Sequence, residues 1–593
     1  MRRSWTLPII GFILALTMRV VGIDFFLPHQ SDPDDHAIDQ LQQIQTGESE
    51  YAYSWGKYGH LIPRGISALP RPHTEAALET ASVQSHFDVA GQNHLRARWI
   101  SAILGALVVP GTYWLARYWF SGGWAFFAAL MAGTSLLHVS FSQQARPHVP
   151  FATLALFAVL AAMRLRRLPN APRLAAYCAL LFLTVGTLHS AAFLLPAGLL
   201  AVWLSREPGR LPLPALGWQV LVVLGSLAAF WPFLYGPVET FVVANQETSN
   251  RFPHMLGASM FTGGGFLIWY DALRGYDPVL LWSSALGLVL ALQRLLNWKQ
   301  GAPDPETSES RKDLIVMLGF AVPCTLAFGL FRFSFERFFI PLYPFLALLS
   351  ALALHDLTAL VGRALPRLRA PAGVVLAALI LALPTFASAK LVWLRSQPDS
   401  FQQAAAFLEQ SLESERILLH PRAFLPLAGH LDESATDASR RVPYSSAWLR
   451  YLSKRNREGH KHGGGELVAF PPEWNQLSRS GLPADIAKLR RALPKLNSTA
   501  ALCVVSEGGG RTEGLRQALL GIADRVWLTE HRPGARYAND GYQEDEMLEI
   551  VLNAHVWGPR LAIFRIRGEP KSAAESNRES KSFEAEEDST QAE

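Results

Sequence analysis

Four short segments of the sequence place ionisable residues at the ends of long apolar runs. The candidate site residues in them are Asp34 and Asp35 (in HQSDPDDHAID), Arg146 and His148 (in SQQARPH), His189 (in GTLHS), and Glu336 and Arg337 (in FRFSFERFF). Ionisable groups next to hydrocarbon are costly, so their presence indicates a function. Arginine binds phosphate oxygens in a forked geometry, and a carboxylate can act as general base or hold a divalent cation. Together these residue types predict a reaction on a phosphate that is carried by a lipid.

Long apolar runs identify the elements that must position these residues. The chain has 593 residues, 50% of them hydrophobic, and the apolar ones concentrate between positions 5 and 390. Segments of about 17–25 mostly apolar residues suit a bilayer core. Eleven spans are predicted, at 5–27, 97–116, 121–140, 149–163, 174–190, 191–204, 216–235, 278–296, 313–331, 338–356 and 370–389. We therefore expect a mainly α, polytopic membrane protein whose first span is an uncleaved anchor.

Basic residues in the short connections set the expected orientation. Arg2 and Arg3 precede the first span, and the arginines of RLRRLPNAPR, SREPGR and GRALPRLR fall on the same side when eleven spans alternate. Because cytoplasmic loops are enriched in Lys and Arg, the N-terminus is predicted to be cytoplasmic and the residues after 390 extracytoplasmic. The net charge of +5 comes mostly from these flanking arginines. They form no basic stripe with interleaved aromatics, so no nucleic-acid partner is expected.

Composition divides the chain into five parts. They are a first transmembrane helix (1–27), an extracytoplasmic acidic loop (28–96), a transmembrane bundle (97–390), an extracytoplasmic α/β domain (395–568) and a disordered acidic tail (569–593). In the fourth part, SFQQAAAFLEQSLES, ADIAKLRRAL and EGLRQALLGI predict helices, whereas RILLH, ALCVVS, RVWLTE and RLAIFRI predict strands. The tail has almost no large apolar residues, which is typical of a chain that cannot form a core.

Several segments resemble membrane glycosyltransferases of the GT-C fold, and more narrowly the family-39, protein-mannosyltransferase-like group. MRVVGIDFFLPHQSDPDDHAIDQLQQIQTGE is similar to that family's first helix, with its late arginine, and to the acidic loop that follows. RWISAILGALVVPGTYWLARYWF and the stretch through SQQARPH resemble the next two spans, and ERFFIPLYPFLALLSALAL resembles a later RY-x-LP span. The resemblance covers residues 1–165 and one later helix, and implies a GT-C-type helical bundle.

The resemblance also implies an activity. Members of the group take a sugar from a polyprenyl-phosphate donor and transfer it, with inversion, to an acceptor hydroxyl on the outer face of the membrane. The chain is then expected to be a hexosyl- or pentosyltransferase of the inner or plasma membrane, acting on a glycan, lipid or protein. Asp34 is the candidate base and Asp35 assists it, and both are candidate ligands of a divalent cation, Mg²⁺ or Mn²⁺. Arg337 and Arg146 are the candidates for binding the donor phosphate. Further candidate substrate-binding residues are His148, Glu336 and His189.

Two positions depart from the family pattern, and other readings stay open. His148 stands where the family often has Asp, which argues against a second carboxylate in that loop, and Phe338 replaces a Tyr. The acidic segment could instead be an ordinary solvated loop, and the Arg146 side chain could instead extend from a helix end to the membrane interface. A multi-pass transporter or a non-catalytic scaffold for glycan assembly or export is the alternative function. Transporter sites usually lie near the midplane between repeated halves, whereas these charges flank the spans and no repeat is visible.

Overall fold

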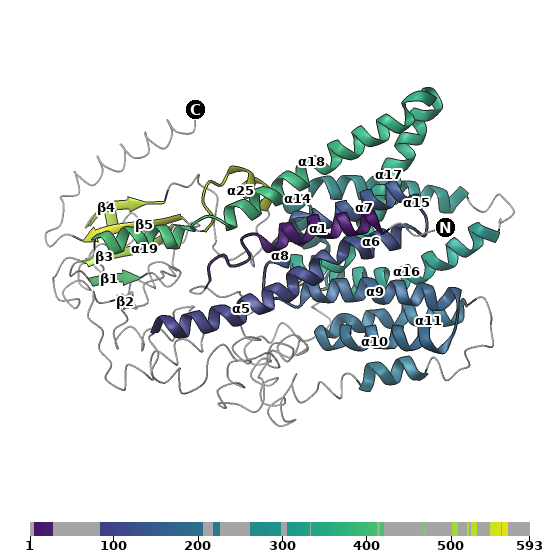
Figure 1. The fold of residues 1–593 in the computed structure, drawn as a ribbon, viewed down its shortest axis with the longest axis horizontal. Helices are drawn as coiled ribbons and strands as arrows, with labels where there is room; N and C mark the ends of the chain where they lie inside the picture. The colour runs from purple at the N-terminus through teal and green to yellow at the C-terminus, as the bar shows by residue number, and fades with distance from the viewer. Residues whose placement is uncertain are drawn as a thin grey trace.

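The computed structural model shows a helical bundle with a β-sheet at one end of it (Figure 1). It describes residues 5–27, 83–205, 217–225, 261–297, 305–332, 334–411, 416–419, 467–469, 501–507, 519–520, 523–529, 546–558 and 560–566. The acidic segment with Asp34 and Asp35 therefore lies outside the described residues. The same holds for the predicted tail, for the predicted helix ADIAKLRRAL and for most of EGLRQALLGI.

The bundle is built from α-helices and short 3₁₀ helices that follow the apolar runs. In chain order they are α1 (Thr6–Val20), α5 (Val83–Ala106), α6 (Val108–Ala116), α7 (Gly122–Gly133), α8 (Leu136–Ser142), α9 (His148–Arg167), α10 (Ala171–Thr187), η1 (His189–Leu194), α11 (Leu195–Trp203), α14 (Gly264–Tyr276), α15 (Pro278–Asn297), α16 (Pro305–Leu330), η5 (Glu336–Leu342), α17 (Tyr343–Ala364), η6 (Pro366–Leu368) and α18 (Arg369–Arg395). Within the described residues, five helical segments are long and apolar enough to cross a membrane. A sixth is added if the bent pair α7–α8 forms one span, and four further apolar helices are shorter.

Each predicted span coincides with a described helix, except that only 217–225 of the span at 216–235 are described. The predicted mainly helical fold is confirmed, and the number of crossings stays a prediction. Two features differ from the prediction. Helix α5 begins at Val83 and not near residue 97, because a polar sequence free of proline continues the helix beyond its apolar part. Helix α14 was not predicted, since Asp271 and Arg274 interrupt its apolar pattern.

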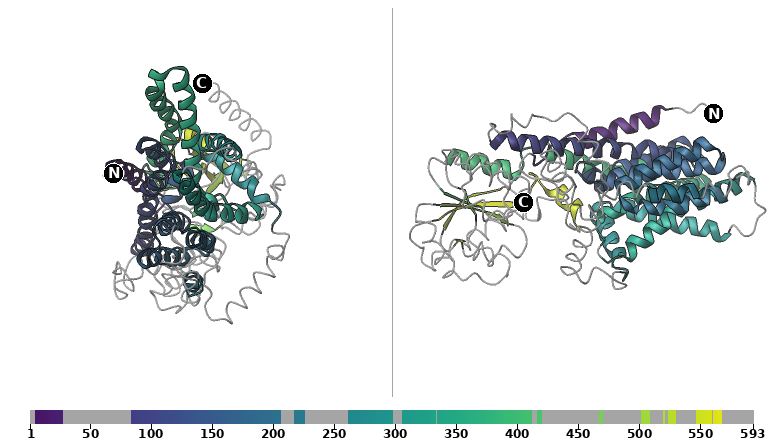
Figure 2. Two further views of the ribbon diagram at one scale, coloured as in Figure 1. Left: turned by 90° about the vertical axis from the view of Figure 1, so that its right-hand side faces the viewer. Right: turned by 90° about the horizontal axis from the view of Figure 1, so that it is seen from below.

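Most of the helices lie side by side along the long axis of the molecule, and the α17–α18 hairpin projects from the bundle (Figures 1 and 2). Helix α9 packs against α5, α6, α10, α11, α16 and η5. Its buried face contains Ala152, Ala155, Ala158 and Ala162. Small residues let neighbouring helices approach closely, which is how helices associate where apolar burial alone gives little. The helix that carries His148 at its start is thus held on several sides.

The sheet has five strands in the order β2-β1-β3-β5-β4. The strands are β1 (Arg416–Leu419), β2 (Leu467–Ala469), β3 (Ala501–Glu507), β4 (Ala523–Leu528) and β5 (Arg560–Ile566). Strand β1 pairs in parallel with β2 and β3, whereas β5 pairs antiparallel with β3 and β4. The four predicted strands are confirmed, and so is the helix at α19 (Ser400–Ser411). Strand β2 and helix α25 (Met547–Asn553) are too short to give a clear periodic signal in the sequence.

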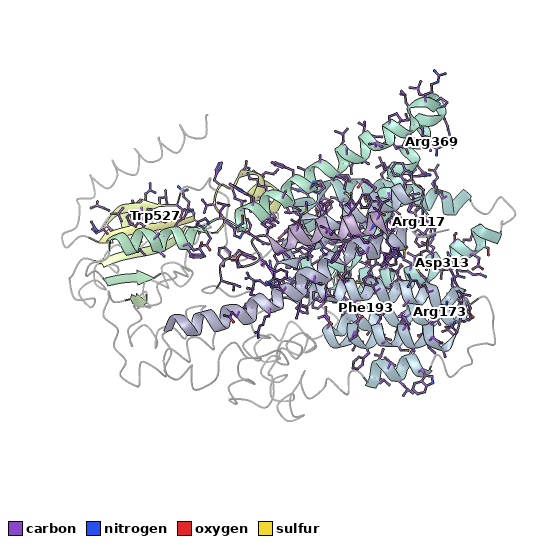
Figure 3. The ribbon with its side chains drawn as sticks, in the orientation of Figure 1. Arg117, Arg173, Phe193, Asp313, Arg369 and Trp527 are labelled. Carbon is purple, nitrogen blue, oxygen red and sulfur yellow. The ribbon has the colours of Figure 1, made fainter. Side chains whose placement is uncertain are left out.

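The two ends of the bundle differ in charge. Arg117, Arg173, Asp313 and Arg369 all lie at the end away from the sheet, whereas Trp527 lies in the sheet (Figure 3). At that far end Asp313 accepts hydrogen bonds from Arg166 Nε at 2.8 Å and from Arg167 Nε at 2.8 Å. Of the basic connections predicted to share one side of the membrane, the two that the structure describes in full, around residues 164–173 and 363–369, lie at this one end of the molecule.

Candidate functional site

The start of α9 and the 3₁₀ helix η5 bring four of the predicted site residues into one buried region. Arg146 and His148 are 1% exposed, Glu336 is 2% exposed and Arg337 is 7% exposed. The Phe338 ring stacks on the His148 ring with centroids 5.5 Å apart, and the Arg337 guanidinium lies 5.5 Å from the centre of the same Phe338 ring. His148 and Arg337, far apart in the sequence, are thus joined through one aromatic side chain.

Proline residues place these side chains at helix starts. Pro147 is the N-cap of α9, directly between Arg146 and His148. Pro341 lies inside η5 and Pro344 follows in the first turn of α17, where a missing backbone N–H costs little. The Ser101 hydroxyl donates to the carbonyl of Arg146 at 3.3 Å, which ties this turn to α5. Prolines at both turns, and the hydrogen bond from Ser101 at the first, therefore restrict the backbone conformation around the site residues.

Aromatic rings surround the charged groups of this region. The Arg337 guanidinium lies 4.1 Å from the centre of the Phe335 ring, and Phe338 contacts Phe328 with ring centroids 5.2 Å apart. Phe328 in turn contacts Phe193 of η1, at 5.6 Å. A guanidinium over an aromatic face keeps its charge while losing water, so an anion here would meet a poorly screened cation. His189, the first residue of η1, is placed in the fold, but its side chain lies outside what the structure describes.

The end of α1, which leads into the acidic segment, is fixed by polar side chains from α5 and the end of α8. Arg98 Nη1 donates to the carbonyls of Ile23 and Phe25, both at 2.8 Å. Gln143 Nε2 donates to the carbonyl of Val21 at 2.7 Å. Bonds from a charged donor are stronger than neutral ones, and these carbonyls have no helical partner. The chain therefore leaves α1 along a defined path.

Arg395, at the end of α18, completes this arrangement. Its Nη1 donates to Gln143 Oε1 at 2.6 Å and to the carbonyl of Ser140 at 3.2 Å. The Phe25 ring is contacted by two guanidinium groups, that of Arg395 at 4.1 Å and that of Arg98 at 4.3 Å. We call Val21–Phe25 with Arg98, Gln143 and Arg395 the exit clamp. Asp34 and Asp35 follow the exit clamp in the sequence and lie outside the described residues.

Arg19 and Asp277 support the same region and were not among the predicted site residues. Arg19 is fully buried and donates to Ser142 Oγ at 3.1 Å and to the carbonyl of Gly133 at 3.0 Å. Asp277 caps the start of α8, accepting from Ser135 Oγ at 2.8 Å and from the backbone N–H of Leu136 at 2.8 Å. The late position of Arg19 in its apolar helix was a usable signal. The only sequence signal of Asp277 was its place as a single acidic residue between apolar runs.

Positive charge exceeds negative charge among the described, buried residues at the sheet-facing end. The buried arginines there are Arg19, Arg98, Arg146, Arg337 and Arg395. The buried carboxylates there are Asp277, Glu336 and Asp399. Buried charge needs compensation, so this end suits a bound anion or the approach of further carboxylates. Among the described residues no group of three His, Cys, Asp or Glu side chains gathers in a way that could hold a metal, and the two candidate ligands, Asp34 and Asp35, lie outside that part of the chain.

Comparison with known proteins gives matches among solved structures alone. No known protein family matches the sequence, and no curated protein does. The chain is similar to ArnT from Cupriavidus metallidurans bound to undecaprenyl phosphate, with 15% identity, a TM-score of 0.45, and 95% of this chain and 98% of that chain covered. It is also similar to the oligosaccharyltransferase AglB from Archaeoglobus fulgidus in complex with an inhibitory peptide and a dolichol-phosphate. There the identity is 13%, the TM-score 0.42, and the coverage 89% and 73%.

A third similar structure is the protein O-mannosyltransferase Pmt1–Pmt2 complex from S. cerevisiae, bound to its sugar donor. It shows 15% identity and a TM-score of 0.29, with 45% of this chain and 36% of that chain covered. All three are GT-C glycosyltransferases. That is the class which the sequence motifs resemble.

Proposed function

We propose that this chain is a membrane glycosyltransferase that transfers a sugar from a polyprenyl-phosphate donor to an acceptor hydroxyl. The observation that carries the proposal is the excess of buried arginine at the sheet-facing end, beside the exit clamp that leads to Asp34 and Asp35. A lipid phosphate supplies the anion that such a region suits, and the polyprenyl chain extends into the bilayer. The donor class, the acceptor and the inversion at the sugar carbon are all part of the proposal.

Arg337 and Arg146 are the proposed ligands of the donor phosphate. Both are buried; Arg337 contacts the Phe338 ring of the His148–Phe338 stack, and Arg146 lies two residues before His148. A low-dielectric setting strengthens their attraction for the phosphate charge that grows as the sugar leaves, which lowers the barrier. Glu336, adjacent to Arg337, is proposed to orient the bound donor, and His148 to contact the sugar or the phosphate. His189 keeps the same proposed role on the evidence of its sequence position alone.

Asp34 is proposed to take the proton of the acceptor hydroxyl. The hydroxyl oxygen forms a bond to the anomeric carbon, the bond from that carbon to the phosphate oxygen breaks, and polyprenyl phosphate leaves. Attack opposite the leaving group inverts the anomeric carbon. Asp35 is proposed to assist, by orienting the acceptor or by sharing with Asp34 a divalent cation that offsets phosphate charge.

The distribution of charge along the helices favours this function over transport. Helix α9 has no charged residue between His148 and Arg164, and the segment from Arg337 to His355 has none either. Transporter sites for ions or polar substrates usually lie near the midplane, on broken helices. Here the ionisable residues of these helices gather at the two ends. We therefore also propose that the sheet-facing end is extracytoplasmic and the basic end cytoplasmic.

Transfer by the purified chain tests the proposal. The protein is incubated with polyprenyl-phosphate sugars and a membrane extract of the host cell as the source of acceptor, and release of polyprenyl phosphate is measured for the wild type, Asp34→Asn and Arg337→Gln. A general base contributes about 10²–10⁴-fold and a charge-stabilising group about 10²–10³-fold, so each variant should lose at least about a hundredfold. Arg363→Gln, at the exposed end of α17, is the matched control and should keep its activity. Near-normal turnover by Asp34→Asn would overturn the assignment of the base.

A further inference from the structure

A cavity of about 1130 Å³ lies at the basic end of the bundle, opposite the proposed donor site. It is bordered by α1, α6, α9 and α10. Its lining includes four arginines, Arg117, Arg164, Arg167 and Arg173, and no Asp or Glu among the described residues that line it. Arg117 and Arg173 are seen at this end in Figure 3. The cavity therefore combines a large, partly open volume with strong positive charge.

Within the described part of the chain, one of these four arginines, Arg167, has an acidic partner. Arg167 pairs with Asp313 and lies 4.3 Å from the centre of the Tyr118 ring. Arg117 donates to the carbonyl of Phe120 at 2.8 Å, and Arg173 donates to the carbonyl of Leu168 at 3.2 Å. Carbonyl groups are neutral, so these bonds orient the guanidinium groups without cancelling their charge. The cavity is thus suited to an anion.

The remaining lining of the cavity is aromatic and aliphatic. Trp5 and Trp114 pack edge to face with ring centroids 5.0 Å apart, and Trp114 contacts Phe157 at 6.2 Å. Leu160 and Leu180 extend the apolar wall along α9 and α10. Tryptophan is enriched at the level of lipid headgroups, where one side of the ring is apolar and the other is wet. An apolar wall next to arginines matches a molecule with a hydrocarbon chain and an anionic head.

We propose that this cavity binds an anionic phospholipid of the membrane. Its phosphate contacts Arg117, Arg164 and Arg173, and one acyl chain lies against Phe157 and Leu180. Arginine binds phosphate oxygens in a forked, charge-assisted geometry, and basic pockets between membrane helices bind acidic headgroups. This site is separate from the donor site, because α9 is 20 residues long and spans roughly 30 Å between the two ends.

Native mass spectrometry of the full-length purified protein tests this proposal. Phosphatidylglycerol and phosphatidylcholine are added in turn, and bound lipid is measured for the wild type and for the double variant Arg164→Gln/Arg173→Gln. Each arginine near a membrane surface contributes about fivefold to binding of an acidic lipid, so the double variant should bind phosphatidylglycerol about 25-fold more weakly. Arg367→Gln/Arg369→Gln removes the same charge from the exposed α17–α18 connection and should bind as the wild type does.

A second variant separates loss of charge from loss of folding. Ala176→Trp fills the cavity from an exposed position of α10 and leaves every arginine in place, so it too should weaken phosphatidylglycerol binding. Inorganic phosphate at millimolar concentration should not displace the lipid if the apolar wall contributes. The proposal is overturned if phosphatidylcholine binds equally well, if the α17–α18 control loses as much binding, or if inorganic phosphate displaces the lipid completely.

Discussion

Replacing Arg395 by alanine should destabilise the protein and reduce sugar transfer together. Arg395 is 3% exposed and donates to Gln143 Oε1 and to the carbonyl and hydroxyl of Ser140, at 2.6, 3.2 and 3.2 Å. Its guanidinium also lies on the rings of Phe25 and Trp557, at 4.1 and 5.2 Å. The substitution removes one side chain that holds α8, the end of α1 and the segment before β5 together.

The size of the effect follows from these contacts. A buried acceptor that loses its donor costs about 1–3 kcal/mol, and a desolvated cation–π contact contributes about 2 kcal/mol. Gln143 Oε1 and the Ser140 carbonyl each lose this donor, so about 1 kcal/mol for each acceptor and about 2 kcal/mol for the ring contacts give an expected loss of about 4 kcal/mol. One kcal/mol shifts the Tm of a 150–250-residue unit by about 2–4 °C, and less in a larger one, so a fall of roughly 5 °C is expected.

Thermal unfolding in detergent, followed by size-exclusion chromatography, measures this shift, and donor turnover is measured at a temperature where the variant is folded. Turnover should still be at least tenfold below the wild type, because the clamp that directs the chain toward Asp34 is broken. Arg367→Ala, at an exposed position, controls for loss of one arginine. An Arg395→Ala protein with both the Tm and the turnover of the wild type would refute the role of the exit clamp.

Three further predictions concern stability. Gly22 has φ +66° and a Cβ there would lie 2.8 Å from the backbone of Arg395, so Gly22→Ala should introduce at least about 1–2 kcal/mol of strain and lower both the Tm and the turnover. Gly123→Ala, where a Cβ has nothing within 4 Å, should lower neither, and equal Tm values for the two variants would contradict this prediction. Asp277→Ala removes the acceptor of the α8 start and should cost about 3 kcal/mol in denaturant unfolding, and an unchanged midpoint would show that α8 needs no cap. Asp313→Ala removes one of the two acidic partners of buried Arg166 and leaves Glu309, so it should cost about 1–3 kcal/mol, while the KM for the donor, bound at the other end, stays constant; a raised KM with unchanged Tm would count against separate ends.

The sequence predicted where helices and strands lie better than it predicted how side chains meet. Apolar runs located the helices because burial in hydrocarbon demands length and composition, and β-rich runs located four strands. The sequence predicted that the segments with His148 and Arg337 lie on the same side of the membrane, but not that Phe338 joins the two side chains. The acceptors of Arg98 and Arg395 are backbone carbonyls, a serine hydroxyl and a glutamine, which no local pattern marks. Such tertiary hydrogen bonds depend on which helices are neighbours.

The start of α5 shows the same limit in a different way. The apolar pattern predicted only the part of the helix that lies within the apolar run, whereas the helix begins earlier, at Val83. No proline stands in the first part of α5, so the helix extends beyond the apolar run without any amphipathic signal, and a prediction based on apolar length ends too soon. The short strand β2 was missed because three residues carry no periodicity.

The most direct test of the central claim is mass spectrometry of lipid-linked sugars and glycoconjugates in cells with the wild-type chain, without the chain, and with Asp34→Asn. The proposed function predicts that one polyprenyl-phosphate sugar accumulates when the chain is absent or carries Asp34→Asn. It also predicts that the same sugar disappears from one class of glycoconjugate. Identical lipid-linked sugars and glycoconjugates in all three kinds of cell would contradict the claim.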